Sequence, residues 1–314
     1  MLTIIAAQAL AAAASPDLAP RSLQHQGRTR SWSEHVPAAC VRPATPCLTV
    51  LMLHGGSPPE LRQRMAQRSG RERTPELVAT ATGMVDAARR DGFILIVPKA
   101  ADGNWADGRE GVAAGIDDVG FLRAVLADVA KRAAISPERT FSAGVSNGGM
   151  MSFRLACEAS DRIRGVGAVV ANMSVDLAAA CPKGRPVDIV QVLGAADPLM
   201  KYDGGRIPSQ GGNGTTSAAD TLRLWSARLD TPTAAERKLN EEVTLRTVTA
   251  RNGRIAQYTL ASYGHGWPSG SEGELAGAGG FAGRVMQRLR GTNPTRFDAT
   301  RVLIDFFKAT PPRR

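Results

Sequence analysis

The residues best suited to chemistry lie in a Gly-x-Ser-x-Gly pentad, residues 144–148, with Ser146 at its centre. When such a serine sits on a sharp turn between a strand and a helix, the positions two before and two after it must be small. The preceding segment Arg139–Ala143 has a strand pattern, and the following segment Gly149–Ala159 has apolar residues at helical spacing. A chain with 33 glycines produces such pentads by chance, but strand, turn and helix come here in the required order. We therefore predict that Ser146 is a nucleophile.

A histidine has to activate this serine, because a hydroxyl group is a weak nucleophile at neutral pH. Two of the four histidines, His25 and His35, lie in a weakly patterned N-terminal region, and His54 follows the first apolar strand. His265 lies in a glycine-flanked segment after the last predicted strand, where the base of a hydrolase triad is expected. We expect His265 to take the proton of Ser146.

An aspartate should orient this histidine, and in the chain order Ser, Asp, His it follows a strand downstream of the serine. Asp197 meets this description, since it comes just past the apolar segment Val187–Leu193. Asp203 is the nearby competitor, and an aspartate before a proline is also common in simple turns. From the residues alone, Asp197 is a candidate for the third member of the triad and Asp203 an alternative.

Two backbone N–H groups are expected to bind the oxyanion that forms during acyl transfer. One belongs to Asn147, the residue after the nucleophile. The other is predicted at Gly56 or its neighbour, because the glycine-rich turn His54–Ser57 follows an early central strand. The alternative for this turn is a plain connection between a strand and a loop.

Trp105 lies in the loop Asp102–Gly108, directly after another predicted strand. Open α/β sheets bind their ligands at the carboxyl ends of the strands. The side chain is therefore either a wall of the substrate site or an anchor of its own loop.

The elements that must position these residues alternate between buried strands and helices. Continuous apolar runs, typical of strands buried on both faces, occur at Leu48–Leu53, Phe93–Pro98, Gly165–Val170 and Val187–Leu193. Helical patterns begin at Thr74, at Asp117 or Asp118, at Ala218 and near Asp298, and Gly92 ends the first of them. Asn252-Gly253 joins two alternating segments as a hairpin. This alternation predicts an α/β fold with a mainly parallel central sheet covered by helices on both faces. Together with the Gly-x-Ser-x-Gly turn between a strand and a helix, it indicates an α/β-hydrolase fold.

The length of 314 residues fits one large α/β domain. Residues 1–14 are apolar and end in small residues, which is typical of a secretory signal peptide, although the usual positive start is missing. We therefore expect a signal peptide at 1–14, a single catalytic domain at 15–314 and a secreted or periplasmic protein. No apolar run after the leader is long enough to cross a bilayer.

Four cysteines are present, an even number that suggests two disulfides in an exported protein and allows three pairings. We predict the two local pairs, Cys40 with Cys47 and Cys157 with Cys181. In a cytoplasmic protein the same residues would be reduced and buried. No pair has the Cys-x-x-Cys spacing, so a zinc site is not expected.

The formal net charge of +10 raises the question of an anionic partner such as nucleic acid. The densest basic segment, Arg62–Arg73, contains no aromatic residue, and aromatic residues make up 5% of the chain. A nucleic-acid groove combines basic and aromatic side chains. We expect a solvated basic surface and no nucleic-acid partner; the sequence leaves the oligomeric state open.

Four blocks together resemble the bacterial polyhydroxybutyrate depolymerase-like esterases, a group that includes feruloyl and acetylxylan esterases. They are Asp117–Phe121, Gly144–Met151, Ala196–Pro198 and Gly264–Pro268, and the resemblance extends from about Arg30 to the C-terminus. It implies a triad of Ser146, Asp197 and His265, and it places Trp105 and Trp267 beside the acyl site.

The resemblance implies hydrolysis of carboxylic esters through an acyl-enzyme, without a metal or organic cofactor. No polymer-binding module follows the catalytic region, so the expected substrates are hydroxyalkanoate oligomers or aromatic and acetyl esters. The basic segment Leu61–Arg73 has no assigned counterpart in that family. The alternatives are an acyltransferase of the same fold and a non-catalytic binding protein on a hydrolase scaffold.

Overall fold

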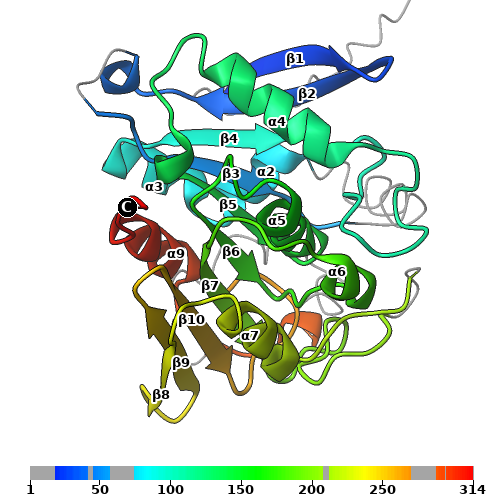
Figure 1. The fold of residues 1–314 in the computed structure, drawn as a ribbon, viewed down its shortest axis with the longest axis vertical. Coiled ribbons are helices and arrows are strands. Elements are labelled where there is room, and N and C mark those ends of the chain that lie inside the picture. Colours follow the sequence, from blue (N-terminus) through cyan, green and yellow to red (C-terminus); the bar gives the residue numbers. More distant parts are fainter. Residues whose placement is uncertain are drawn as a thin grey trace, which may run out of the picture.

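One ten-stranded sheet crosses the molecule, with the strand order β1-β2-β4-β3-β5-β6-β7-β10-β9-β8 (Figure 1). The structure, a computed structural model, describes residues 18–41, 45–56, 74–207, 212–269, 288–293 and 295–313. The central pairings, from β4 through β3, β5, β6 and β7 to β10, are parallel, and the pairings at both ends of the sheet are antiparallel. This is the mainly parallel sheet predicted from the sequence.

The strands have the following bounds: β1 Ala19–His25, β2 Arg28–His35, β3 Thr49–Leu53, β4 Ile94–Pro98, β5 Thr140–Val145, β6 Gly165–Val169, β7 Asp188–Gly194, β8 Thr233–Lys238, β9 Val243–Ala250 and β10 Gly253–Leu260. Every residue of β3 to β7 is buried, as the continuous apolar runs predict for β3, β4, β6 and β7. Strand β5 is the one predicted before the pentad. The predicted Asn252-Gly253 turn joins β9 to β10.

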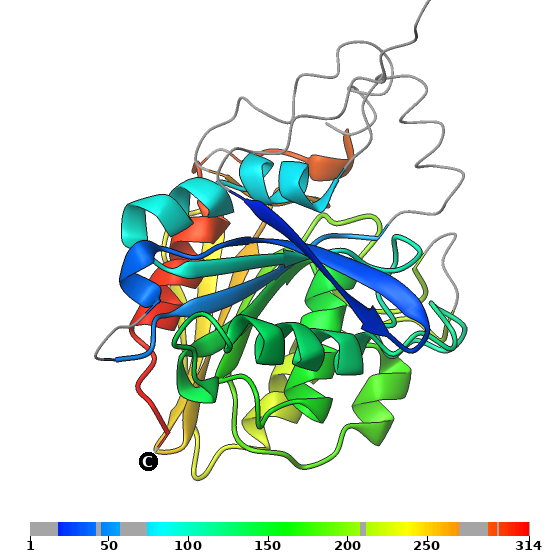
Figure 2. The same cartoon turned by 90° about the horizontal axis from the view of Figure 1, so that it is seen from above.

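Helices cover both faces of this sheet, as the alternation of elements predicts (Figures 1 and 2). One face carries α4 Asp118–Val129, α5 Asn147–Glu158, α6 Val175–Ala180 and α7 Ala218–Ser226, whose apolar residues share one core. The other face carries α2 Pro75–Ala81, α3 Met84–Asp91 and α9 Ala299–Lys308, which share the second core. Two short 3-10 turns also occur, at Ala38–Cys40 and Pro137–Arg139.

The single helix predicted between Thr74 and Gly92 is wrong, because the chain forms α2 and α3 instead. Gly83 takes a left-handed conformation, with φ of 74°, between the two helices. An α-helix cannot continue through such a residue, so the second helix starts in a new direction. Gly92 does end α3 as predicted, also in a left-handed conformation.

Both predicted disulfides are present. Cys40 pairs with Cys47 beside the end of α4, and Cys157 near the end of α5 pairs with Cys181 at the end of α6. Disulfides persist in oxidising compartments, so this pairing is consistent with an extracellular protein.

None of the helices in the described part of the chain is long and apolar enough to span a membrane. The expected signal segment 1–14 and the basic segment 61–73 lie outside the described residues.

Candidate active site

Ser146 occupies the turn between β5 and α5. Its φ of 55° and ψ of −123° are unusual for a residue with a side chain, and its N–H donates to the carbonyl oxygen of Val169 at 2.9 Å. In this strained turn the half-buried side chain of Ser146 points out from the carboxyl end of the sheet. The chain therefore presents this hydroxyl on a rigid corner between two buried elements.

Two glycines of the pentad are required by close packing around this turn. A Cβ atom on Gly144 would lie 2.3 Å from the carbonyl of Gly148, and a Cβ atom on Gly148 would lie 2.2 Å from the carbonyl oxygen of Leu53. Both distances are far below any real contact of a methyl group. The small residues that the pentad pattern demands are therefore needed to let β5, α5 and β3 meet.

The structure brings together the three residues proposed as a triad. The Nε2 atom of His265 lies 3.0 Å from the Oγ atom of Ser146, and its Nδ1 atom lies 2.8 Å from the Oδ2 atom of Asp197. An ionised carboxylate can only accept hydrogen bonds, so Nδ1 carries the ring proton and Nε2 is free to accept from the serine hydroxyl. This is the tautomer that a general base requires.

Asp197 is held firmly by its own turn after β7. Its Oδ1 atom accepts hydrogen bonds from the N–H groups of Leu199 and Met200, both at 2.8 Å. Its side chain is 1% exposed, whereas that of His265 is 17% exposed. The carboxylate is thus shielded and the imidazole can be reached from solvent. The competitor Asp203 is exposed in the following turn.

A segment that the sequence interpretation did not use fixes the histidine turn. The N–H of His265 donates to the carbonyl of Leu289 at 2.5 Å, and the N–H of Gly264 donates to the carbonyl of Arg290 at 2.7 Å. A Cβ atom on Gly264 would lie 2.1 Å from the Leu289 oxygen, which explains the glycine before the histidine. No local pattern in the sequence points to this pairing, because the two segments are joined through residues outside the described part.

Tyr263 packs beneath this turn. The residue is 1% exposed, and its hydroxyl would lie 3.1 Å from a Cβ atom on Gly266. Burial raises the pKa of the Tyr263 phenol well above its ordinary value, because the phenolate would lose its hydration.

The two segments expected to supply oxyanion donors lie side by side. A Cβ atom on Gly56 would lie 3.0 Å from the Oδ1 atom of Asn147. Asn147 is the first residue of α5, so its N–H has no carbonyl partner within the helix. The structure therefore brings the Gly56 turn against the start of the nucleophile helix.

The conformation of the turn before Gly56 is fixed by a neutral His54. Its Nε2 atom accepts from the N–H of Ala100 at 3.1 Å, so its Nδ1 atom carries the proton and donates to the carbonyl of Gly55 at 2.9 Å. His54 therefore has a structural role beside the site.

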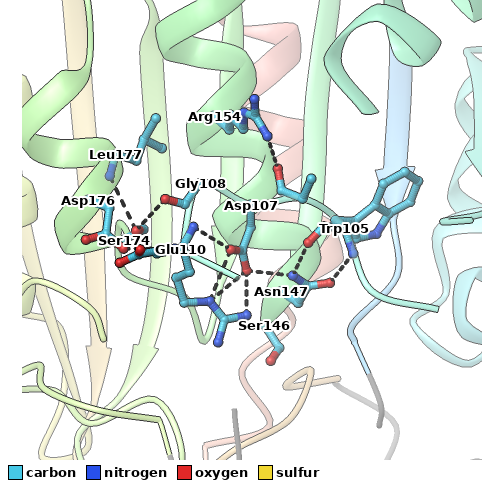
Figure 3. Close-up of polar contacts among 12 residues, drawn as sticks. Trp105, Asp107, Gly108, Glu110, Ser146, Asn147, Arg154, Ser174, Asp176 and Leu177 are labelled. Carbon is cyan, nitrogen blue, oxygen red and sulfur yellow. Dashed lines mark hydrogen bonds and ion pairs between the residues drawn. The ribbon is translucent and has the colours of Figure 1, made fainter. Parts of the chain in front are cut away.

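Trp105 is a loop anchor in this structure, which corrects its expected place as a wall of the substrate site. Its side chain is fully buried, its Nε1 atom donates to the carbonyl of His54 at 3.0 Å, and its ring packs on the His54 ring with centroids 5.1 Å apart. Its main chain is bonded to the side chain of Asn147 (Figure 3). A buried indole whose N–H is already used leaves no face for a substrate.

Trp267 is also buried, so it offers almost no surface to a substrate, contrary to the expectation. It is 5% exposed, and its Nε1 atom donates to the Oγ1 atom of Thr300 at the start of α9. Thr300 in turn donates to the carbonyl of Thr82. The indole therefore joins the histidine turn to the helices on one face of the sheet.

A buried ion pair that the sequence interpretation missed lies behind Asn147. The side chains of Asp107 and Arg109 are both 0% exposed and approach to 2.6 Å, and Asp107 also accepts from the Asn147 amide (Figure 3). The neighbouring Ala106 N–H donates to Asp118, and burial raises the pKa of that carboxyl although Ala106 and Arg30 act in the opposite direction. Two charged residues separated by one glycine are common in surface turns, so this buried pair could not be predicted from the sequence.

No family model matches the chain. A curated relative is NocK from Nocardia uniformis subsp. tsuyamanensis, named as an esterase, which is 28% identical over 78% of this chain and 72% of its own length. Feruloyl esterase B from Piromyces equi is 32% identical over 38% of this chain, and feruloyl esterase C from Emericella nidulans is 27% identical over 38%. The matches span 23% and 42% of those two proteins.

Solved structures share the fold over most of the chain. Native sOPH gives a TM-score of 0.50 with 17% identity, over 89% of this chain and 90% of its own. A variant of pOPH with DMSO gives a TM-score of 0.51 with 15% identity, over 97% and 93%. The chain is thus similar to a protein named as an esterase along most of its sequence and shares the α/β-hydrolase fold with these solved structures, and both findings support an esterase-like α/β-hydrolase.

Proposed function

We propose that the chain hydrolyses carboxylic esters with Ser146 as nucleophile, His265 as general base and acid, and Asp197 as the group that orients the imidazole. The observation that supports this assignment most directly is the continuous hydrogen-bonded line from Asp197 Oδ2 through both ring nitrogens of His265 to Ser146 Oγ. Its distances, 2.8 and 3.0 Å, lie within the range required for proton transfer.

In the first half of the reaction, the Oγ atom of Ser146 attacks the ester carbonyl carbon and its proton passes to Nε2 of His265. Asp197 stabilises the imidazolium that forms and does not take the proton itself. When the tetrahedral intermediate collapses, the bond to the alcohol oxygen breaks and Nε2 returns the proton to that oxygen. The alcohol leaves, and the acyl group remains on Ser146.

In the second half, a water molecule takes the place of the alcohol. Nε2 of His265 accepts a proton from this water as its oxygen attacks the acyl carbon. Collapse of the second intermediate breaks the bond to Oγ, which receives the proton from the imidazolium. The products are a carboxylic acid and the original serine.

The negative charge on the carbonyl oxygen in both intermediates needs fixed donors. The N–H of Asn147 meets this need because it heads a helix, where the peptide dipoles also favour negative charge. The N–H of Gly56 or its neighbour is the second donor in this proposal. Removing one such donor typically costs about 3 kcal/mol of transition-state stabilisation.

For the substrate we propose hydroxyalkanoate oligomers or aromatic and acetyl esters. Six of the curated relatives carry the name feruloyl esterase, which supports the aromatic esters. We further propose one catalytic domain over residues 15–314 and a secreted or periplasmic location, with 1–14 as its signal. The two disulfides support an oxidising compartment.

A panel of esters tests the activity. It contains p-nitrophenyl esters of increasing acyl length, methyl ferulate and a hydroxybutyrate oligomer, each assayed in water and with an added alcohol acceptor. We expect free acid as the main product, together with adduct formation on Ser146 by a fluorophosphonate. Transfer products dominating at low acceptor concentration would instead support an acyltransferase.

The variant Ser146→Ala completes this test. We expect its hydrolysis rate to fall by about 10⁴-fold or more, because the nucleophile is removed. Activity equal to that of the wild type would support a binding protein with an unrelated contaminating activity.

A further inference from the structure

The side chain of Asn147 is bonded in a way that a purely local helix start does not require. Its Oδ1 atom accepts from the N–H of Trp105 at 2.7 Å, and its Nδ2 atom donates to the carbonyl of Trp105 at 3.0 Å and to Oδ2 of Asp107 at 2.6 Å (Figure 3). The residue is 2% exposed. All three contacts belong to one loop, so the amide plane is fixed from both sides.

The same loop also holds the other segment expected to donate to the oxyanion. The indole N–H of Trp105 donates to the carbonyl of His54, the residue that begins the turn to Gly56. The Trp105 loop thus bonds both to His54, where the glycine turn begins, and to Asn147, the residue after the nucleophile. The relative position of the two N–H groups therefore depends on where this loop lies.

Asp107 and Arg109 make this arrangement rigid. Both oxygens of Asp107 accept from the Nε atom of Arg109, at 3.1 and 3.0 Å, and Oδ2 also accepts from its Nη2 atom at 2.6 Å. An isolated buried carboxylate would be strongly unfavourable and would repel a developing oxyanion nearby. The guanidinium balances that charge, so the carboxylate can bind Asn147 without adding net negative charge to the site.

We propose that Asp107, paired with Arg109, is a positioning residue that sets the oxyanion-binding N–H groups through Asn147 and Trp105. This inference rests on the proposed esterase function. It assigns to Asp107 no contact with the substrate. Its effect is on the transition state, because the oxyanion forms only there and its donors must be in place beforehand.

The test compares p-nitrophenyl acetate with its thiono analogue, in which sulfur replaces the carbonyl oxygen. Sulfur accepts hydrogen bonds poorly, so an intact oxyanion site favours the oxygen ester, and a displaced site loses that preference. The variants are Asp107→Ala and Asn147→Ala; the second keeps the backbone N–H and removes only the side-chain contacts. We expect kcat for the oxygen ester to fall roughly 10- to 100-fold in each, with KM within about threefold of the wild type.

The ratio of oxygen-ester to thiono-ester kcat/KM should fall about tenfold in both variants. The kcat of the double variant should be no more than about threefold below that of the less active single variant, because the effects of residues that act as one unit are not additive.

The matched control is Asp188→Ala. Asp188 is another buried aspartate bonded to a buried arginine, Arg164, at 2.9 Å, and it lies at the opposite end of the strands from Ser146. We expect this variant to lose stability while keeping the wild-type ratio. An equal fall of the oxygen-ester to thiono-ester ratio in Asp188→Ala would overturn the proposal. The fall would then come from a general loss of rigidity and not from displaced oxyanion donors.

The remaining outcomes are also decisive. Folded Asp107→Ala and Asn147→Ala proteins with kcat within threefold of the wild type, or with lower kcat and an unchanged ratio, would contradict the positioning role. If Asp107→Ala does not fold, the ratio measured for Asn147→Ala decides whether the proposal holds, because this variant leaves the Asp107–Arg109 ion pair intact. A wild-type chain inactive on every ester would remove the proposed function, and the positioning role with it.

Discussion

Gly148 and Leu53 meet so closely that a Cβ atom on the glycine would lie 2.2 Å from the leucine carbonyl oxygen. The contact joins the first turn of α5 to the end of β3. It lets the chain after β3 pass beside the start of the nucleophile helix, where Gly56 lies next to Asn147. The approach of two main chains, and not the flexibility of the turn, therefore explains the second glycine of the pentad.

We expect Gly148→Ala to lower the free energy of unfolding by about 3 kcal/mol and to abolish most ester hydrolysis. The three atoms nearest to the added methyl group are main-chain atoms of Leu53 and His54, so β3 and α5 must separate. Urea unfolding and ester assays measure the two effects. The control is Gly83→Ala, where φ is 74° and no atom of the described residues, apart from the glycine and its chain neighbours, lies within 4 Å of the added carbon. It should cost only about 1 kcal/mol and leave activity intact. Equal effects of the two variants would mean that the Gly148 contact is unimportant.

We expect Asp197→Asn to lower kcat by about 10⁴-fold with a nearly normal fold. The amide can donate to Nδ1 and so stabilises the tautomer with its proton on Nε2, which cannot accept from Ser146. Steady-state kinetics on p-nitrophenyl acetate give the value.

The matched control for this change is Asp203→Asn, the exposed neighbour in the next turn. It should keep its kcat within about twofold of the wild type. A large loss in Asp203→Asn together with a small loss in Asp197→Asn would reverse the assignment of the acid.

The two disulfides should differ in how much they stabilise the fold. The pair Cys157–Cys181 has a sequence separation of 24, and Cys40–Cys47 has one of 7. In the chain-entropy model, closing the longer loop contributes about 3.5 kcal/mol and closing the shorter one about 2.5 kcal/mol. Double alanine variants, compared by urea unfolding, check the order. A greater loss on removing the shorter loop would show that packing around the cysteines outweighs chain entropy.

Tyr263 should make the fold sensitive to alkaline pH. Its pKa is raised in the folded state by burial, so above pH 10 the unfolded chain releases the phenolic proton while the folded chain retains it. The unfolded state then binds fewer protons, and the free energy of unfolding falls as pH rises. From this residue alone we expect a loss of about 1.4 kcal/mol between pH 9 and pH 11.

The variant Tyr263→Phe tests this dependence. Within the described ranges the hydroxyl has no hydrogen-bond partner, so at pH 7 the variant should differ from the wild type by less than about 1 kcal/mol. Its unfolding free energy should fall less between pH 9 and pH 11 than that of the wild type. Identical curves for the two proteins would show that this phenol ionises normally.

The central part of the fold was predictable because burial on both faces leaves a strong local pattern. Strands β3, β4, β6 and β7 are fully buried runs of mainly apolar residues, and such runs are visible in the sequence without any knowledge of their neighbours. Strand β8, Thr233–Lys238, has no such pattern, since all its residues are exposed. It exists because β9 offers a free edge, and edge pairing uses main-chain groups that every sequence has.

The hairpin β1 and β2 was missed for the same reason. All residues of β1 except Leu23 and His25 are exposed, and the hairpin joins the sheet only through four residue pairs of β2 with β4. The N-terminal region is therefore only weakly patterned in the sequence. Its polar composition gave no periodicity from which to infer two long paired strands.

The sequence by itself determined where a nucleophile turn forms and in what order a serine, an aspartate and a histidine follow three strands, because glycine requirements and apolar runs are local properties. Only the tertiary structure decided that Trp105 and Trp267 are anchors and that Asp107 and Arg109 are buried together behind Asn147. Whether an aromatic ring faces a ligand or the core, and whether a charge is solvated or paired, depends on which distant segments pack against it. That packing is set by the whole sheet and its helices, and no short stretch of sequence contains it.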